Sequence, residues 1–126
     1  MDMQDGRVCL IVDDSRVVRT VAGRIVKDLG FTVSEAGDGA SALQRCQAQM
    51  PDVILLDWNM PIMNGIDFLT SLRRSDGGKA PVVVLCTNEK DPDHIGEALR
   101  AGADEYIMKP FDADIVRSKF DQLGLV

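Results

Sequence analysis

The sequence predicts an α/β fold in which one parallel sheet lies between two layers of helices, a doubly wound (βα)5 arrangement. Short apolar runs alternate with amphipathic helical segments, and the connections between them are short. Several of the apolar runs are nearly continuous, as expected of strands that helices cover on both faces. The chain has 126 residues, of which 45% are hydrophobic, so we expect one domain with a single core over residues 1–126.

Five segments have the patterns of strands. Three are short apolar runs rich in β-branched residues, which is typical of central strands: residues 7–12, 52–56 and 81–86. The segment 31–36 alternates apolar and polar residues and 105–108 is brief, so both suit half-covered edges. Placing these two at the edges predicts the strand order 2-1-3-4-5, a known order of doubly wound sheets with a topological switch between the first and third strands.

Helical patterns separate these strands. The first spans residues 16–29, with Ser15 as its N-cap and Gly30 as its stop. Apolar and small residues spaced three or four apart mark the other four: Ala40, Leu43 and Cys46; Gly65, Leu69 and Leu72; Ile95, Ala98, Leu99 and Gly102; and Val116, Phe120 and Leu123. Right-handed crossovers then place helices on both faces of the sheet.

Composition excludes several classes of function. Twenty acidic residues against 14 basic ones give a net charge of −6, so we expect no nucleic-acid partner. No apolar run approaches the ~20 residues of a membrane span, and the polar N-terminal segment lacks a signal-peptide pattern, so we expect a cytoplasmic protein without a membrane partner. Cys9, Cys46 and Cys86 are interpreted as reduced packing thiols, with a redox role as the alternative.

Polar side chains end four of the predicted strands at one edge of the sheet. Asp13 and Asp14 follow the first strand, Asp57 the third, Thr87 the fourth and Lys109 the fifth. Ligands of such sheets bind beyond the carboxyl ends of the strands, at the topological switch. Three carboxylates about 5 Å apart would repel one another by roughly 3 kcal/mol per pair at an effective dielectric of about 20. A cation would relieve this repulsion, and oxygen ligands with open positions favour Mg²⁺ over Ca²⁺.

Thr87 and Lys109 are surplus to a metal site, and their chemistry indicates a second ligand. An ammonium and a hydroxyl that face a divalent cation across a carboxylate can hold the three oxygens of a phosphoryl group. The carboxylate can then act as the covalent nucleophile. Taken alone, Asp13 and Asp14 could simply cap the first helix, but their partners at three other strand ends argue against that reading.

Four motifs resemble, in order, the signatures of the receiver domains of two-component response regulators: VDDS at 12–15, LLDWNMPIMNGIDFL at 55–69, CT at 86–87 and GADEYIMKPF at 102–111. This likeness covers nearly the whole chain. Within the family, DWNMP, Tyr106 and the closing KFDQLGLV resemble the stand-alone, CheY-like chemotaxis regulators. The resemblance implies the flavodoxin-like receiver fold with the strand order given above.

The resemblance also implies a metal site and an acceptor. Asp57 is expected to be the phosphoacceptor. The cofactor Mg²⁺ is expected on Asp14 and Asp57, with Asp13 contributing through water and Asn59 through its backbone carbonyl. In the family these ligands make the aspartyl chemistry dependent on Mg²⁺.

The remaining site residues are expected to bind phosphate and to switch. By the resemblance, Thr87 and Lys109 hold the phosphoryl oxygens, and the bond between Lys109 and Pro110 is cis. Thr87 and Tyr106 act as the switch, with Tyr106 changing rotamer on activation.

Three residues bear on the lifetime of the phosphoryl group and on access to it. Asn59 and Glu89 stand where the family sets the rate of dephosphorylation, and we expect a short-lived phosphoryl group. Asn88 stands where the family usually has a small residue, which could crowd the phosphoryl group or alter the fit of a partner.

The function that the resemblance implies is that of a monomeric regulator and not of an enzyme, apart from catalysis of its own phosphorylation and dephosphorylation. It would accept a phosphoryl group from a sensor histidine kinase and signal in chemotaxis through the face of its fourth helix, fifth strand and fifth helix. The downstream partner would be a flagellar motor switch protein or, for a phosphorelay shuttle, a phosphotransfer protein. The sequence does not choose between these two.

Three other functions suit the sequence less well than this one. A phosphatase of the haloacid dehalogenase type would carry D-x-D after its first strand, where this chain has DDS and no room for a cap domain. A flavin-binding module would need a phosphate loop at that place, and DDSR would repel the phosphate. A degenerate receiver that serves only as a scaffold is disfavoured because all five chemical residues are present.

Overall fold

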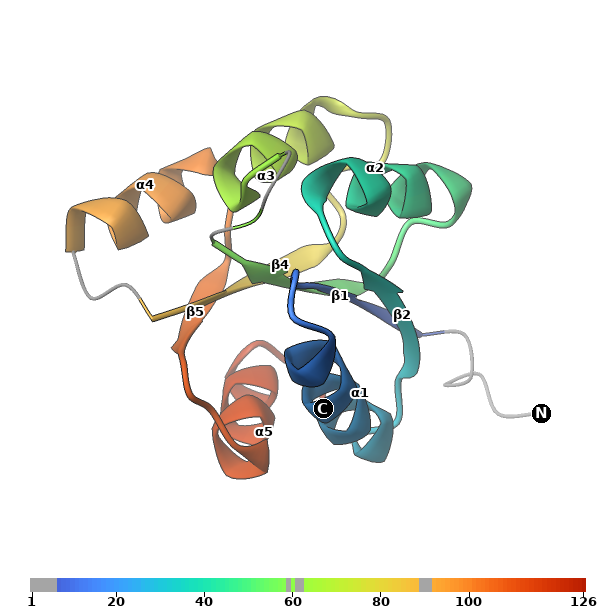
Figure 1. The fold of residues 1–126 in the computed structure, drawn as a ribbon, viewed down its shortest axis with the longest axis vertical. Coiled ribbons are helices and arrows are strands. Elements are labelled where there is room, and N and C mark those ends of the chain that lie inside the picture. The colour runs from blue at the N-terminus through green and yellow to red at the C-terminus, as the bar shows by residue number, and fades with distance from the viewer. Residues whose placement is uncertain (1–6, 59, 61–62, 89–91) are drawn as a thin grey trace.

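The computed structural model describes residues 7–58, 60, 63–88 and 92–126. Within them, strands and helices alternate from end to end, and Figure 1 shows α2, α3 and α4 on one face of the sheet and α1 and α5 on the other. The elements are β1 (Val8–Val12), α1 (Arg16–Asp28), β2 (Thr32–Ala36), α2 (Gly39–Ala48), β3 (Val53–Asp57), α3 (Gly65–Arg74), β4 (Val82–Thr87), α4 (Pro92–Ala101), β5 (Glu105–Met108) and α5 (Ala113–Gln122). The predicted α/β class is confirmed.

The strands form one parallel sheet in the order β2-β1-β3-β4-β5, which confirms the predicted order. Its register aligns the carboxyl ends of the strands: Val12 pairs with Leu56, Asp57 with Cys86 and Thr87 with Met108. The residues that follow β1, β3, β4 and β5 therefore meet at one edge of the sheet.

β3 and β4 each begin and end one residue later than the sequence predicted. The prediction followed apolar side chains, whereas a strand is defined by its backbone pairing, which continues through Asp57 and Thr87. At the other end, Pro81 has no backbone N–H to donate to a ladder. Asp57 and Thr87 are thus the last residues of their strands and are held by the sheet itself.

The core has two halves, one on each face of the sheet. On one face Phe68 and Leu72 of α3 pack over the central strands, and both are fully buried. On the other, the rings of Phe31 and Phe120 meet edge to face with centroids 5.6 Å apart. The helical packing on both faces holds the central strands rigidly, so their carboxyl ends form a fixed platform.

The three cysteines are free and buried, which confirms that they are packing thiols. Burial raises the pKa of Cys46 to about 11 and that of Cys86 to about 12. At neutral pH these groups are therefore neutral thiols and poor nucleophiles.

α1 begins and ends much as its sequence predicted. The Ser15 side chain accepts a hydrogen bond from the backbone of Val18 at 3.2 Å, and Gly30 follows the helix with a φ of 101°. The helix itself ends at Asp28, with Leu29 as its C-cap. Among the residues that the structure describes, none of the helices combines the length and the hydropathy of a membrane span.

Candidate functional site

The carboxyl edge of the sheet brings the three predicted carboxylates together. Asp13 and Asp57 are buried, with exposed fractions of 3% and 7%, whereas Asp14 is exposed to solvent. One carboxylate oxygen from each of the three lies within 4.8 Å of the others. Thr87, at the end of the neighbouring strand, is 1% exposed. The topology has therefore collected side chains that lie as far as 74 positions apart in the chain.

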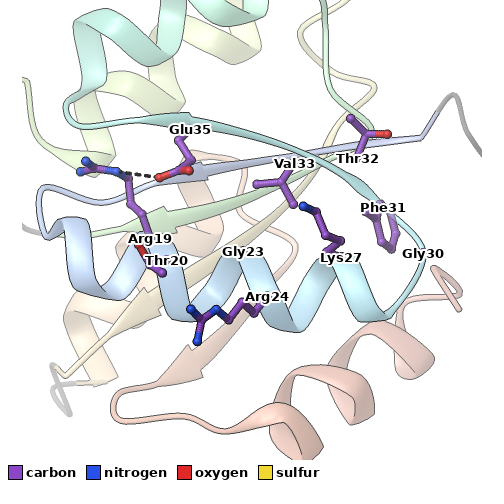
Figure 2. A pocket seen from close by; sticks show the side chains of 10 residues that line it. All are labelled: Arg19, Thr20, Gly23, Arg24, Lys27, Gly30, Phe31, Thr32, Val33 and Glu35. Atoms are coloured by element: carbon purple, nitrogen blue, oxygen red, sulfur yellow. Dashed lines mark hydrogen bonds and ion pairs between the residues drawn. The ribbon is translucent and has the colours of Figure 1, made fainter.

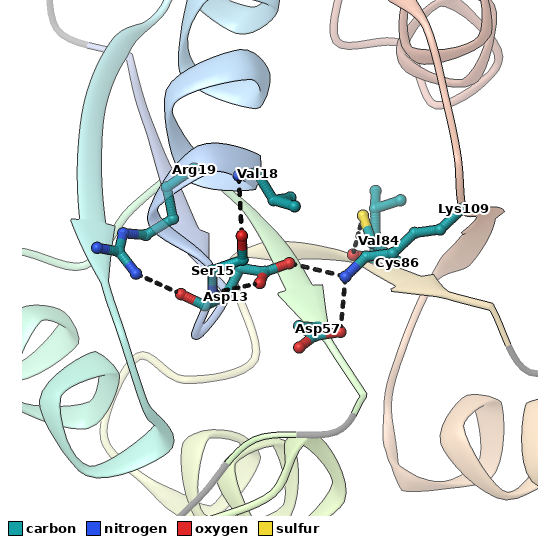
Figure 3. Close-up of polar contacts among 8 residues, drawn as sticks. All are labelled: Asp13, Ser15, Val18, Arg19, Asp57, Val84, Cys86 and Lys109. Carbon is teal, nitrogen blue, oxygen red and sulfur yellow. Dashed lines mark hydrogen bonds and ion pairs between the residues drawn. The ribbon is translucent and has the colours of Figure 1, made fainter.

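Lys109 lies between the two buried carboxylates. Its Nζ atom is 2.8 Å from Oδ2 of Asp13 and 2.9 Å from Oδ1 of Asp57, as Figure 3 shows. The backbone N–H of Lys109 donates to the carbonyl of Thr87 at 2.8 Å, which ties the residue to the end of β4. The peptide bond between Lys109 and Pro110 is cis. The ammonium thus contacts the site from the side of β5.

The pKa values of this pair reflect burial and mutual contact. Burial raises the pKa of Asp57 above its ordinary value, and the hydrogen bond from Lys109 offsets only part of that rise. Burial by itself lowers the pKa of Lys109, but its hydrogen bonds to Asp13 and Asp57 and the negative charge of these two carboxylates together outweigh burial and raise the pKa. One ammonium faces three carboxylates, so the described site carries an excess of negative charge when all three are ionised.

The residues fit a hydrated Mg²⁺ ion. The donors are carboxylate oxygens without histidine or cysteine, one of them is open to solvent, and their spacing allows a single ion to contact all three. A bound cation would supply the positive charge that Lys109 alone does not provide.

The loop that carries Asp13 and Asp14 is held by several contacts. The backbone N–H of Asp13 donates to the carbonyl of Ala36 at 3.1 Å, and the N–H of Ser15 donates to Oδ1 of Asp13 at 2.9 Å. Arg19 donates from Nη1 to the carbonyl of Asp13 at 2.7 Å. The predicted helix cap at Ser15 is confirmed, whereas the contact of Arg19 becomes visible only in the structure.

Gly65, which the sequence places in the third helix as a packing glycine, packs directly against the end of β3. A Cβ atom there would lie 2.7 Å from the carbonyl oxygen of Asp57. Its N–H donates to the carbonyl of Trp58 at 3.0 Å. A side chain at this position would push α3 away from the end of β3, so the glycine is needed for the close approach.

Tyr106 lies on β5, two residues before Met108, which pairs with Thr87. The tyrosine is half-buried, and the ammonium of Lys119 lies 5.5 Å from the centre of its ring. Thr87 and Tyr106 therefore occupy neighbouring strands, as expected, and the switch itself stays a prediction. The expectations for Asn59 and Glu89 fall outside the described residues.

A doubly wound sheet with an acidic triad and a lysine at its switch point defines the receiver class of regulatory domains. Residues 9–121 match the response regulator receiver domain family, and the chain belongs to it. Like other receiver domains of this family, it is a regulator and not the catalyst of a metabolic reaction.

The individual relatives are similar along nearly their whole length. The chemotaxis protein CheY of Pseudomonas aeruginosa is 39% identical over 115 residues, which cover 90% of this chain and 93% of the relative. CheY-3 of Vibrio cholerae is also 39% identical, over 90% of this chain and 88% of its own length. The solved structure of CheY4 of Vibrio cholerae superposes with a TM-score of 0.87 at 31% identity, covering 92% of this chain and 97% of that one. The chain is thus CheY-like in both sequence and fold.

Proposed function

We propose that this response regulator accepts a phosphoryl group on Asp57 from a sensor histidine kinase, in a reaction that depends on Mg²⁺, and that it signals in chemotaxis. The observation that carries the proposal is the position of the Asp57 carboxylate. It ends a central strand, lies within 4.8 Å of two further carboxylates, and contacts Lys109. The names of the relatives support the pathway.

The transfer forms one bond and breaks one. A carboxylate oxygen of Asp57 attacks the phosphorus of the kinase's phosphohistidine, and a P–O bond forms. The P–N bond breaks, its electron pair stays on the imidazole nitrogen, and that nitrogen takes up a proton. Because the transition state is loose, positioning and charge neutralisation supply most of the catalysis.

Each polar residue has a share in this step. Asp13, Asp14 and Asp57 would hold Mg²⁺, which when bound neutralises charge on the transferring group. Lys109 is already hydrogen-bonded to Asp57, so its ammonium is placed to move onto a phosphoryl oxygen. Thr87 would bind another phosphoryl oxygen from the end of β4. The Lys109 ammonium would then contact a phosphoryl oxygen in addition to carboxylates.

Labelling with a small phosphodonor tests the acceptor. With Mg²⁺ present, acetyl phosphate should label Asp57 without a kinase, because the site itself provides both nucleophile and charge stabilisation. Borohydride reduction followed by mass spectrometry locates the label. Asp57→Asn should abolish labelling, and the control Asp76→Asn, at an exposed loop carboxylate, should keep it. Labelling at another residue, or full labelling of Asp57→Asn, would refute the assignment.

The output surface that we propose is made by α4, β5 and α5. Leu99 is exposed on α4, and Lys119 of α5 contacts both Glu105 and Tyr106 of β5, so side-chain contacts join α5 to β5. Movement of Thr87 toward a phosphoryl oxygen would change the packing space beside Tyr106, because the two lie on neighbouring strands.

NMR with and without beryllofluoride tests the output surface. Backbone shifts at Ile95, Leu99 and Lys119, together with a change in the Tyr106 ring signals, are expected. Thr87→Ala should still accept a phosphoryl group on Asp57 but should transmit it poorly to a partner. Perturbation confined to the loops around Asp57 would refute the proposed surface.

Affinity capture tests the partner. The phosphorylated protein, compared with Asp57→Ala, should retain a flagellar motor switch protein from the native cell. Retention of a histidine phosphotransfer protein that takes up the phosphoryl group would contradict the motor role and favour a relay role. In either case the protein is proposed to act as a monomer in the cytoplasm.

A further inference from the structure

One guanidinium joins the edge strand to the acidic loop. Arg19 of α1 donates from Nε to Oε1 of Glu35 at 3.0 Å, which Figure 2 shows, and from Nη1 to the carbonyl of Asp13 at 2.7 Å, which Figure 3 shows. Its side chain is only 19% exposed, although α1 lies at the surface. The guanidinium therefore bridges β2 and the loop after β1.

The carbonyl that Arg19 contacts belongs to the peptide unit between the first two acidic residues. Because a peptide unit is planar, fixing the direction of the Asp13 carbonyl also fixes the N–H of Asp14 and the position of its Cα atom, from which the side chain departs. The other contacts of this loop act on the N–H of Asp13 and on its carboxylate. Only Arg19, among the described contacts, holds the carbonyl.

The charge of Arg19 has to be balanced for this to help a cation bind. A bare guanidinium beside the acidic loop would repel a metal ion. The ion pair with Glu35 offsets that charge while leaving the hydrogen bond to Asp13 in place. A guanidinium can hold both acceptors at once because its donors form a rigid fork, whereas a lysine ammonium acts as a single point charge.

We propose that Arg19 is a positioning residue that orients the Asp13–Asp14 peptide for metal binding, with Glu35 cancelling its charge. This inference rests on the proposed function only through the binding of Mg²⁺. Arg19 contacts neither the metal ligand oxygens nor Asp57 in the described contacts, so it acts through the backbone. Outer contacts of this kind typically change metal affinity by about 10–100-fold when removed.

A titration with Mg²⁺, followed by the fluorescence of Trp58, the residue after Asp57, tests the effect on affinity. Arg19→Ala should weaken Mg²⁺ binding by about tenfold, and Arg19→Lys should recover only part of the loss. Arg24 lines the same groove between α1 and β2 but lies farther along the helix, as Figure 2 shows, so Arg24→Ala is the matched control and should bind as the parent does. Unchanged or tighter binding in Arg19→Ala would overturn the proposal, since a purely electrostatic role predicts tighter binding.

A second readout needs no metal. In metal-free protein, amide hydrogen exchange at Ser15 and Asp14 should be faster in Arg19→Ala than in the parent, because the peptide is no longer held. Exchange should be unchanged in Arg24→Ala. If the parent failed to bind Mg²⁺, the proposed function would fail, but this measurement would still report on Arg19. Equal exchange in parent and Arg19→Ala would overturn the positioning role whatever the titration gave.

Glu35→Gln separates charge from geometry, and it also serves if Arg19→Ala does not fold. The amide keeps an acceptor for Arg19 but removes the compensating charge. Binding of Mg²⁺ should therefore be a few-fold weaker than in the parent at low ionic strength, and this difference should shrink as salt is added, because Glu35 is 47% exposed and its effect is screened. Exchange at Ser15 should stay as in the parent. A loss that salt does not reverse would contradict the charge-cancelling role.

Discussion

The two ends of the sheet carry polar networks of opposite character. At the carboxyl end, the single ammonium of Lys109 is shared by two buried carboxylates, and a third carboxylate lies close by. At the amino end, Arg73 binds mainly backbone carbonyls. The first network has more negative than positive charge, whereas the second is nearly neutral.

The amino-end network is closed. Nε and Nη2 of Arg73 both donate to the carbonyl of Gly102, at 3.1 and 2.7 Å, and Nη1 donates to the carbonyls of Gly78 and Pro81 at 2.9 and 2.8 Å. Oδ2 of Asp104 accepts from Nη2 of Arg73 at 3.1 Å and from the N–H of Val83 at 2.8 Å. Arg73 and Asp104 together hold the turns before β4 and β5 in place, and this network is called the clasp below.

The difference teaches how a site and a structural clasp can be told apart. Both networks bury charged groups at strand ends, so burial alone does not distinguish them. In the clasp each donor of Arg73 meets a neutral carbonyl or its one counter-ion, and nothing is left to attract a ligand. At the other end the charges do not cancel, so the Mg²⁺ ion that we propose would stabilise this network.

The largest expected effect is at the clasp. Arg73→Ala should lower the free energy of unfolding by about 3 kcal/mol, because it leaves several half-buried or buried carbonyls without a donor. The loss should be the same with and without Mg²⁺. Urea denaturation measures it, and the exposed neighbour Arg74→Ala is the control. A loss as small as that of Arg74→Ala would show that the clasp does not stabilise the fold.

Magnesium should affect only the other end. At a concentration about ten times its dissociation constant, Mg²⁺ should raise the free energy of unfolding by about 1.4 kcal/mol, because it binds the gathered carboxylates and not the unfolded chain. Asp14→Ala should remove this response while Arg73→Ala keeps it. Thermal or urea unfolding with Mg²⁺ and with EDTA makes the comparison. An undiminished response in Asp14→Ala would disprove the metal site.

The smallest effect is that of the buried Asp57 carboxylate in metal-free protein. Because the pKa of Asp57 is raised on folding, the folded state binds its proton more tightly than the unfolded state. Stability should therefore fall as the pH rises from the ordinary carboxyl pKa through the raised value. Asp57→Asn carries no such charge, so it should be more stable than the parent at neutral pH and equal to it in acid.

Unfolding measured in EDTA across this pH range tests the sign. The gain of Asp57→Asn should grow through the same window and then level off. A variant that is less stable than the parent at neutral pH would mean that the hydrogen bond from Lys109 outweighs the cost of burying Asp57. The two ends of the sheet would then differ less than their charges suggest.

Much of the site follows from the sequence because parallel topology is a strong constraint. Once the apolar runs are read as strands of one doubly wound sheet, whatever follows them must meet at its carboxyl edge. Asp13, Asp57, Thr87 and Lys109 could therefore be grouped in advance, and the structure places them at that edge. The exact ends of β3 and β4 were missed because backbone pairing runs on into polar residues.

The sequence by itself determined the class of fold, the two edge strands and the acidic edge, since each depends on periodicity and on where apolar runs stop. The full strand order also drew on a known order of doubly wound sheets. Only the tertiary structure decided which partners Arg19, Gly65 and Arg73 have. Those three lie against backbone carbonyls of residues outside their own helices. Every residue offers the same backbone carbonyl, whatever its side chain, so no residue type or spacing marks which carbonyl will accept. The contact exists only once the chain has folded.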